Sequence, residues 1–231
     1  MTRIPRCASA IALWLMAFAV PARAQTFETQ TPSAQAPNAP SAPADQPSIV
    51  ASTLLFFTGA AAGLAIHESG HVLFGAIFDA NPRVEPLRYG FIPFFKIAHD
   101  PVSRREEFVI SSAGFWMQYV DSEWILSKKP DLRHEHQPLL KGIFAFDMGA
   151  SVVYSIAAFG EFGPPERDTR GMAVSLGKDG WPEPIVGAIV LAPAALDGYR
   201  YFHPDAAWAK WASRGAKIAS VVLVAAAGKE P

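Results

Sequence analysis

Residues 49–78 read IVASTLLFFTGAAAGLAIHESGHVLFGAIF, and this stretch decides the fold. The 22 residues from Gln46 to His67 carry no charged side chain when the histidine is neutral, and Glu68 is the only charge between there and Asp79. At about 1.5 Å per residue, a helix over 49–78 would be roughly 45 Å long, which exceeds the ~30 Å hydrocarbon core of a bilayer. The stretch therefore predicts a helix that crosses a membrane.

Shorter apolar runs of 11 to 13 residues follow this segment, at 108–120, 148–160, 185–196 and 218–228. Taken alone, runs of this length more often form buried helices of soluble domains. Beside a membrane helix they are also compatible with spans whose bordering acids, such as Asp121, Asp147 and Asp197, face the interior of a bundle. The number of crossings after residue 120 stays open at this point.

A β-like stretch, 84–97, lies in the basic connection 79–107 that follows the first apolar segment. Together these patterns predict an all-α polytopic membrane protein, a helical bundle with a small β element after the first core helix. If the first helix runs inward, the basic connection is cytoplasmic, as the positive-inside bias expects. We therefore expect a multi-pass protein of the cell (inner) membrane with an extracytoplasmic mature N-terminus.

The first 47 residues divide into two segments of different character. Residues 1–24 contain basic residues, then an apolar run, then a small-residue end, which is the order of a secretory signal peptide; the alternative is an uncleaved anchor helix. Residues 25–47 contain five prolines among Ala, Ser, Gln and Thr, which predicts a disordered spacer. The membrane-embedded domain is then expected over 48–231.

Composition limits the partners and the metal chemistry. The 231 residues are 50% hydrophobic and 18% charged with a net charge of −1, which excludes a nucleic-acid partner and a disordered chain. The mean hydropathy of +0.15 is an average over a signal, a polar spacer and strongly apolar helices. The only cysteine, Cys7, lies in the signal, so any metal in the mature chain must be bound by His, Asp or Glu.

The sequence HESGH at 67–71 matches the HExxH pattern inside the first apolar segment. Positions i and i+4 share one face of a helix, so His67 and His71 can reach one zinc ion, while Glu68 can act as general base toward a water at the metal. The alternative is a pair of packed histidines, although an ionisable cluster inside an apolar helix is costly without a metal or partners.

Two histidines leave zinc short of a protein ligand. Leu196-Asp197-Gly198 is one candidate, because an aspartate that ends an apolar helix beside a glycine can face inward. This tripeptide is a weak signal on its own, since Asp-Gly is a common turn. The Gly- and Pro-rich stretch 161–168 is interpreted as a loop, either a gate or a plain connector.

Taken together, these motifs resemble the site-2 protease family of intramembrane zinc metalloproteases. The resemblance rests on HESGH at 67–71, SAGFWMQ at 112–118 and APAALDG at 192–198, in the family's order and rough spacing, and it spans about residues 49–202. It implies a membrane-embedded metalloprotease-like domain that cleaves substrate proteins in or next to their membrane-spanning segments.

The same resemblance implies roles for individual residues. Zinc would be bound by His67, His71 and Asp197, with Glu68 as the general base. A further implication is that Gly114 and Gln118 lie near the substrate. The expected partners are therefore a membrane-protein substrate and the lipid bilayer.

The chain also departs from the family's pattern. The middle motif usually has Pro after its Gly and Asn three positions later, where this chain has Phe115 and Gln118, and an Asn before the last motif is replaced by Ile189. These departures motivate one alternative, a membrane scaffold or regulator that does not cleave its partners. A second alternative is a soluble exported metalloprotease whose third ligand is a carboxylate such as Glu85, Glu106 or Glu107.

Overall fold

The computed structural model of the chain describes residues 48–89, 92–177 and 181–227, so the predicted signal peptide (1–24) and spacer (25–47) lie outside the described residues. The described part forms six helices and one two-stranded sheet. In chain order they are α2 (Ile49–Ile77), β1 (Arg83–Tyr89), β2 (Ile92–Ala98), α3 (Arg104–Lys128), α4 (Pro138–Gly160), α5 (Asp168–Ser175), α6 (Glu183–Phe202) and α7 (Ala207–Ala227).

Local sequence explains where the long helices begin. The Ser48 hydroxyl accepts a hydrogen bond from the backbone N–H of Ala51, which caps the start of α2. Ser103 and Glu106 form a reciprocal capping box at the start of α3. A proline, Pro138, occupies the first position of α4, where its missing N–H costs nothing.

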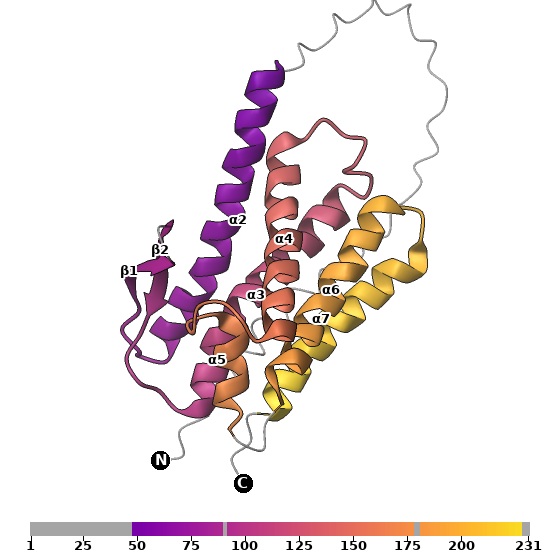
Figure 1. The fold of residues 1–231 in the computed structure, drawn as a ribbon. Coiled ribbons are helices and arrows are strands. Elements are labelled where there is room, and N and C mark those ends of the chain that lie inside the picture. Colours follow the sequence, from indigo (N-terminus) through magenta and orange to yellow (C-terminus); the bar gives the residue numbers. More distant parts are fainter. Residues whose placement is uncertain (1–47, 90–91, 178–180, 228–231) are drawn as a thin grey trace, which may run out of the picture.

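The five long helices, α2, α3, α4, α6 and α7, lie side by side and alternate in direction along the chain, as Figure 1 shows. The β1–β2 hairpin and the short helix α5 both lie at the end of the bundle where α2 finishes (Figure 1). The hairpin is antiparallel and pairs Arg83 with Ala98. This arrangement confirms a mostly helical chain with a small β element after the first core helix.

Helices α2, α4 and α6 are each long and apolar enough to cross a membrane. Glycines bring α2 and α4 into direct backbone contact, since a side chain on Gly59 would overlap the carbonyl of Leu139 and one on Gly142 would overlap the carbonyl of Phe56. Such close approach through small residues is typical of helices that pack in membranes.

Helix α3 is the most enclosed element of the bundle. Fifteen of its 25 residues are buried, including Phe108, Phe115 and Trp116. These side chains form one hydrophobic cluster with Phe74 of α2 and Val190 of α6. Because α3 touches its neighbours on most of its surface, it fixes the position of α2, and thereby of the HExxH histidines.

Candidate metal centre

The HExxH motif lies in the second half of α2, on the face that packs against α3. His67 and His71 are 2% and 6% exposed, and their Nε2 atoms are 3.3 Å apart. The two helices approach closely here, because a Cβ on Gly114 would lie only 2.5 Å from His67 Nε2 and a Cβ on Gly70 only 2.7 Å from the carbonyl carbon of Ala113. The absence of side chains at these glycines gives the imidazoles their space.

The third group beside the histidines is Asp168, the first residue of α5. Its Oδ2 lies 3.0 Å from His67 Nε2 and 3.5 Å from His71 Nε2. Among the described residues, His67, His71 and Asp168 form the one set of three or more potential ligands whose donor atoms lie within 4.8 Å of one another. The structure therefore joins a carboxylate from the 161–168 stretch to the HExxH motif.

The spacing of these three donor atoms fits a tetrahedral zinc ion. Zinc–nitrogen and zinc–oxygen bonds of about 2.0–2.1 Å place neighbouring donors about 3.3 Å apart in a tetrahedron. The observed separations of 3.0, 3.3 and 3.5 Å lie around this value. Two imidazoles and one carboxylate are also a ligand set that catalytic zinc sites use, with a fourth position open for water.

The orientation of His71 suits metal binding. Its Nδ1 lies 2.8 Å from the carbonyl oxygen of Ile110, so Nδ1 carries the hydrogen and donates it. Nε2 is then the ring nitrogen that faces His67 and Asp168, and it is the atom of His71 that would bind a metal. The His67 ring is held by aromatic neighbours instead: Phe115 lies edge-on at 5.6 Å and Tyr154 is stacked at 6.0 Å.

Electrostatics keep the third donor ionised. Burial raises the pKa of Asp168, but the attraction of His71 and the hydrogen bond from His67 outweigh it, and the net result is a pKa well below the usual range. Asp168 is therefore a carboxylate at neutral pH, which is the form that binds a metal.

A cavity of about 560 Å³ opens beside these donors. Glu68, His71 and Asp168 line it together with Tyr154 of α4. Residues 95–99, on and just after β2, and the connection 164–167 before α5 form a further part of the wall. A ligand in this cavity would thus meet His71, Asp168 and the Glu68 carboxylate at the same time.

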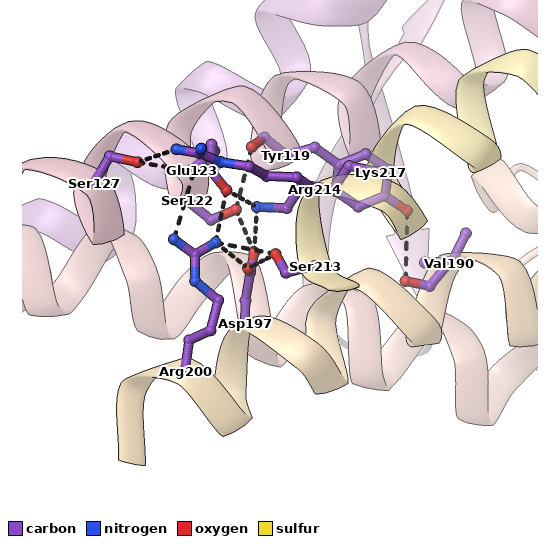
Figure 2. A network of polar contacts seen from close by, with 10 residues as sticks. All are labelled: Tyr119, Ser122, Glu123, Ser127, Val190, Asp197, Arg200, Ser213, Arg214 and Lys217. Atoms are coloured by element: carbon purple, nitrogen blue, oxygen red, sulfur yellow. Dashed lines mark hydrogen bonds and ion pairs between the residues drawn. The ribbon is translucent and has the colours of Figure 1, made fainter. Parts of the chain in front are cut away.

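Asp197 has different neighbours from those that the resemblance implies. It is fully buried, and Figure 2 shows its carboxylate among Lys217 at 2.7 Å, Ser122 at 2.7 Å, Arg200 at 3.2 Å and Ser213. The structure does not bring it into the cluster of potential ligands around the HExxH histidines. The physical reason is charge, because Lys217 and Arg200 already compensate its carboxylate.

The two residues expected near the substrate differ in their surroundings. Gly114 packs against the His67 ring, so it shapes the position of that imidazole. Gln118 is 1% exposed, and neither of its amide atoms has a hydrogen-bond partner in the described part of the chain. Neither residue lines the cavity beside the histidines, and their contact with a substrate stays a prediction.

Sequence reasoning missed Asp168. An aspartate after a Gly- and Pro-rich loop is the ordinary way for a helix to begin, so the stretch carried no metal-binding signal. Comparisons of the chain with protein-family models, curated proteins and solved structures find no match. The features that bear on function are therefore the HExxH motif and the geometry of the three donors.

Proposed function

We propose that the protein is an intramembrane zinc metalloprotease of the site-2 protease type, which hydrolyses peptide bonds in or next to membrane-spanning segments of substrate proteins. The observation that carries this proposal is the convergence of His67, His71 and Asp168, of which His71 and Asp168 line the same cavity as Glu68. The proposed zinc ligands are these three residues, with Asp168 in the place that the resemblance gave to Asp197.

The exposed surface of the helices supports the membrane setting. Leu54 and Phe57 on α2 are 64% and 65% exposed, as expected for side chains that face lipid. Helix α3 carries more charged side chains than any of the three apolar helices, and α7 carries as many as α6. Within α3 and α7, Glu123 and Lys217 are buried inside the bundle. We therefore propose that all five long helices cross the inner membrane, with the buried charges of Glu123 and Lys217 shielded from lipid.

The proposed orientation places the hairpin and α5 on the cytoplasmic side. His67 lies 18 residues into α2 from Ile49, roughly 27 Å along the helix axis. The centre is thus near the end of the crossing, where water can reach the cavity. This depth fits cleavage of a segment at or just inside the membrane surface.

The chemistry divides between the ion and Glu68. Zinc, when bound, lowers the pKa of a water toward neutrality and polarises the substrate carbonyl. Glu68 takes one proton from this water as the water oxygen forms a bond to the carbonyl carbon. When the carbon–nitrogen bond breaks, Glu68 returns the proton to the departing amine, so the carboxylate is regenerated at the end of each cycle.

The substrate must be locally unwound to react. In a helical segment the peptide carbonyls are hydrogen-bonded within the chain, and they are not free to face a nucleophile. A segment with helix-weakening residues near the membrane surface is therefore the favoured substrate class.

The carboxylates that a soluble metalloprotease would need are engaged elsewhere. Glu85 pairs with Arg83, Glu106 caps α3, and Glu107 lies 3.4 Å from His99. The described set of potential ligands includes none of these three glutamates. The third ligands that the soluble alternative invoked therefore lie outside the proposed zinc site.

The test uses the full chain purified in detergent, with zinc measured by mass spectrometry and cleavage measured on a labelled single-span protein that carries a Gly-Pro pair near one end of its helix. Glu68→Gln should keep zinc and lower the cleavage rate by about 10²–10⁴-fold. Glu135→Gln, in the connection between α3 and α4, is the matched control and should cleave normally.

Two results would contradict the proposal. One is a protein that takes up no zinc. The other is a Glu68→Gln variant that matches wild type both in cleavage and in cellular phenotype while a helix-disrupting change does not, because that result favours a non-catalytic membrane scaffold.

A further inference from the structure

Several buried polar atoms in the interior of the bundle have no hydrogen-bond partner among the described residues. They are both amide atoms of Gln118, Oδ2 of Asp121 and both carboxylate oxygens of Asp147. Gln118 is 1% exposed and Asp147 is fully buried. A buried polar atom without a partner is unfavourable, so a group of them in one region is suited to bind a polar or charged ligand.

The three residues belong to one region of the structure. Gln118, Asp121 and Ser122 are spaced i, i+3 and i+4, so they share a face of α3. Ser122 donates a hydrogen bond to Asp197, which shows that this face is directed at α6. Gln118 is therefore aimed into the interior between α3 and α6.

The antiparallel packing of α3 and α4 places Asp147 of α4 beside the part of α3 that contains Asp121 and Ser122. Helices α3 and α4 run in opposite directions (Figure 1), and the rings of Phe115 and Tyr154 are in contact at 5.2 Å. Seven residues forward along α3 and seven back along α4 lead to Ser122 and Asp147. Electrostatic interactions of Asp147 with Asp121, Asp197 and Lys217 agree with this placement.

The charges in this region do not balance. The network in Figure 2 joins two acids, Glu123 and Asp197, to the three bases Arg200, Arg214 and Lys217. Counted in their ionised forms, Asp121 and Asp147 bring the total to four carboxylates against three cationic side chains, which leaves one negative charge for a proton or a cation to balance. A single monovalent cation would balance it, whereas a divalent ion would leave an excess of positive charge.

A proton on Asp147 is the simplest alternative to a bound cation, but it accounts for fewer of the unpartnered polar atoms. One proton removes the excess charge, but it supplies only one hydrogen to a group of five unpartnered atoms. A cation with its water ligands can be bound by carboxylate and amide oxygens together, and such oxygen donors are what hard cations prefer.

We propose that the interior between α3, α4 and α6 binds one monovalent alkali cation through Asp147, Asp121 and Gln118. Seven residues separate Asp121 from Gly114, the residue in contact with His67, so this site lies roughly 10 Å along α3 from the metal centre. Its occupancy stabilises the packing of α3 on α4, and the proposal does not depend on peptidase activity.

The experiment is thermal unfolding of the full chain in detergent at pH 7.5, followed by circular dichroism in sodium, potassium or choline chloride at equal ionic strength. We expect a saturable rise in Tm of about 3 °C or more in sodium or potassium over choline, since a ligand of the native state stabilises it by mass action. Asp147→Asn should abolish the rise and keep bound zinc. Asp205→Asn, at an exposed aspartate, should leave the rise unchanged.

The outcomes separate the proposal from its alternatives. Equal Tm values in sodium, potassium and choline would overturn it and assign a proton to Asp147. A rise that only calcium or magnesium produces would also overturn it. If Asp147→Asn fails to fold, Asp121→Asn and Gln118→Leu take its place, and each must weaken the sodium or potassium midpoint at least about tenfold.

Discussion

Asp168 and Asp197 are both shielded aspartates in a largely apolar bundle, yet their neighbours differ in kind. Asp168 faces two imidazoles, whose Nε2 atoms lie at 3.0 and 3.5 Å, and it borders the cavity. Asp197 faces Lys217 and Arg200 at 2.7 and 3.2 Å and is fully enclosed. The first has donors that an ion can bring together, while the second already has its counter-charges.

This contrast distinguishes a proposed metal site, which contains Asp168, from a structural ion-pair network, which contains Asp197. Imidazole and carboxylate donors that converge on one point can bind a metal, which takes the place of the hydrogens between them. A carboxylate that is matched by an ammonium and a guanidinium has no further need of one, and removal of its partner leaves a buried charge. The two aspartates should therefore respond to substitution in opposite ways.

The largest difference should appear in metal content. Asp168→Ala removes a proposed ligand, so we expect zinc affinity to fall by more than about 100-fold, because even loss of an outer-shell partner costs 10–100-fold. Asp197→Asn should keep bound zinc within about twofold of wild type. Both are measured as zinc per chain after dialysis against a graded chelator. Loss of zinc in Asp197→Asn alone would reverse our assignment and support the ligand that the resemblance implies.

The next effect concerns stability. Lys217 is fully buried and pairs with both Asp197 and Glu123, so Lys217→Met leaves two carboxylates short of a counter-charge. We expect the free energy of unfolding to fall by about 3–5 kcal/mol, with bound zinc retained in the folded fraction. Unfolding in mixed micelles measures this.

The exposed Lys210 on the same helix provides the control for this substitution. Lys210→Met should change the free energy of unfolding by no more than about 0.5 kcal/mol. An equally small effect of Lys217→Met would show that the buried network contributes little to the bundle.

Much of the fold could be predicted from residues near one another in the sequence. The uncharged run predicted a helix over 49–78, and α2 spans Ile49–Ile77. The later apolar runs marked helices but underestimated their lengths, because α3 extends to Arg104–Lys128 through charged ends and buried acids such as Glu123. Hydropathy counts these acids as breaks, whereas tertiary partners make them interior residues.

The candidate site was predictable only in part for the same reason. The HExxH pair is a local pattern on one helix, so the sequence identified His67, Glu68 and His71. The third donor, Asp168, comes from a separate helix about a hundred residues later. An acid with cationic neighbours is already compensated, so the third donor has to be an acid without them. Lys217 and Arg200 compensate Asp197 and so exclude it as the third donor. No spacing in the sequence predicts that Lys217 pairs with Asp197.

A smaller effect tests whether Gly114 positions His67 in the proposed metal site. Gly114→Ala would place a methyl group 2.5 Å from His67 Nε2, which forces the imidazole or α3 to move. We expect a loss of about 1–3 kcal/mol in stability and a weaker zinc site, measured by unfolding and by chelator competition.

A glycine in open space gives the matched control for this change. A Cβ on Gly149 of α4 meets nothing within 4 Å, so Gly149→Ala should be neutral or stabilise by up to about 1 kcal/mol. Equal effects of the two alanines would mean that Gly114 has no special role in positioning His67.

The smallest effect comes from the ion pair of His99 and Glu107, which belongs neither to the proposed metal site nor to the buried ion-pair network. His99 lies on the cavity wall with its Nε2 3.4 Å from Glu107, and the hydrogen bond to that carboxylate raises the pKa of His99 above its usual 6.5. Its stabilisation is therefore fully present below about pH 6.5 and is lost as the pH rises through the raised value. Because Glu107 is partly exposed, the loss should be less than about 1 kcal/mol.

His99→Gln should remove this part of the pH dependence between pH 6 and 9, measured in the Asp168→Ala background so that metal binding does not contribute. His203→Gln, at an exposed histidine, should retain it, and a His99→Gln profile that still matches its parent would show that the pair contributes nothing.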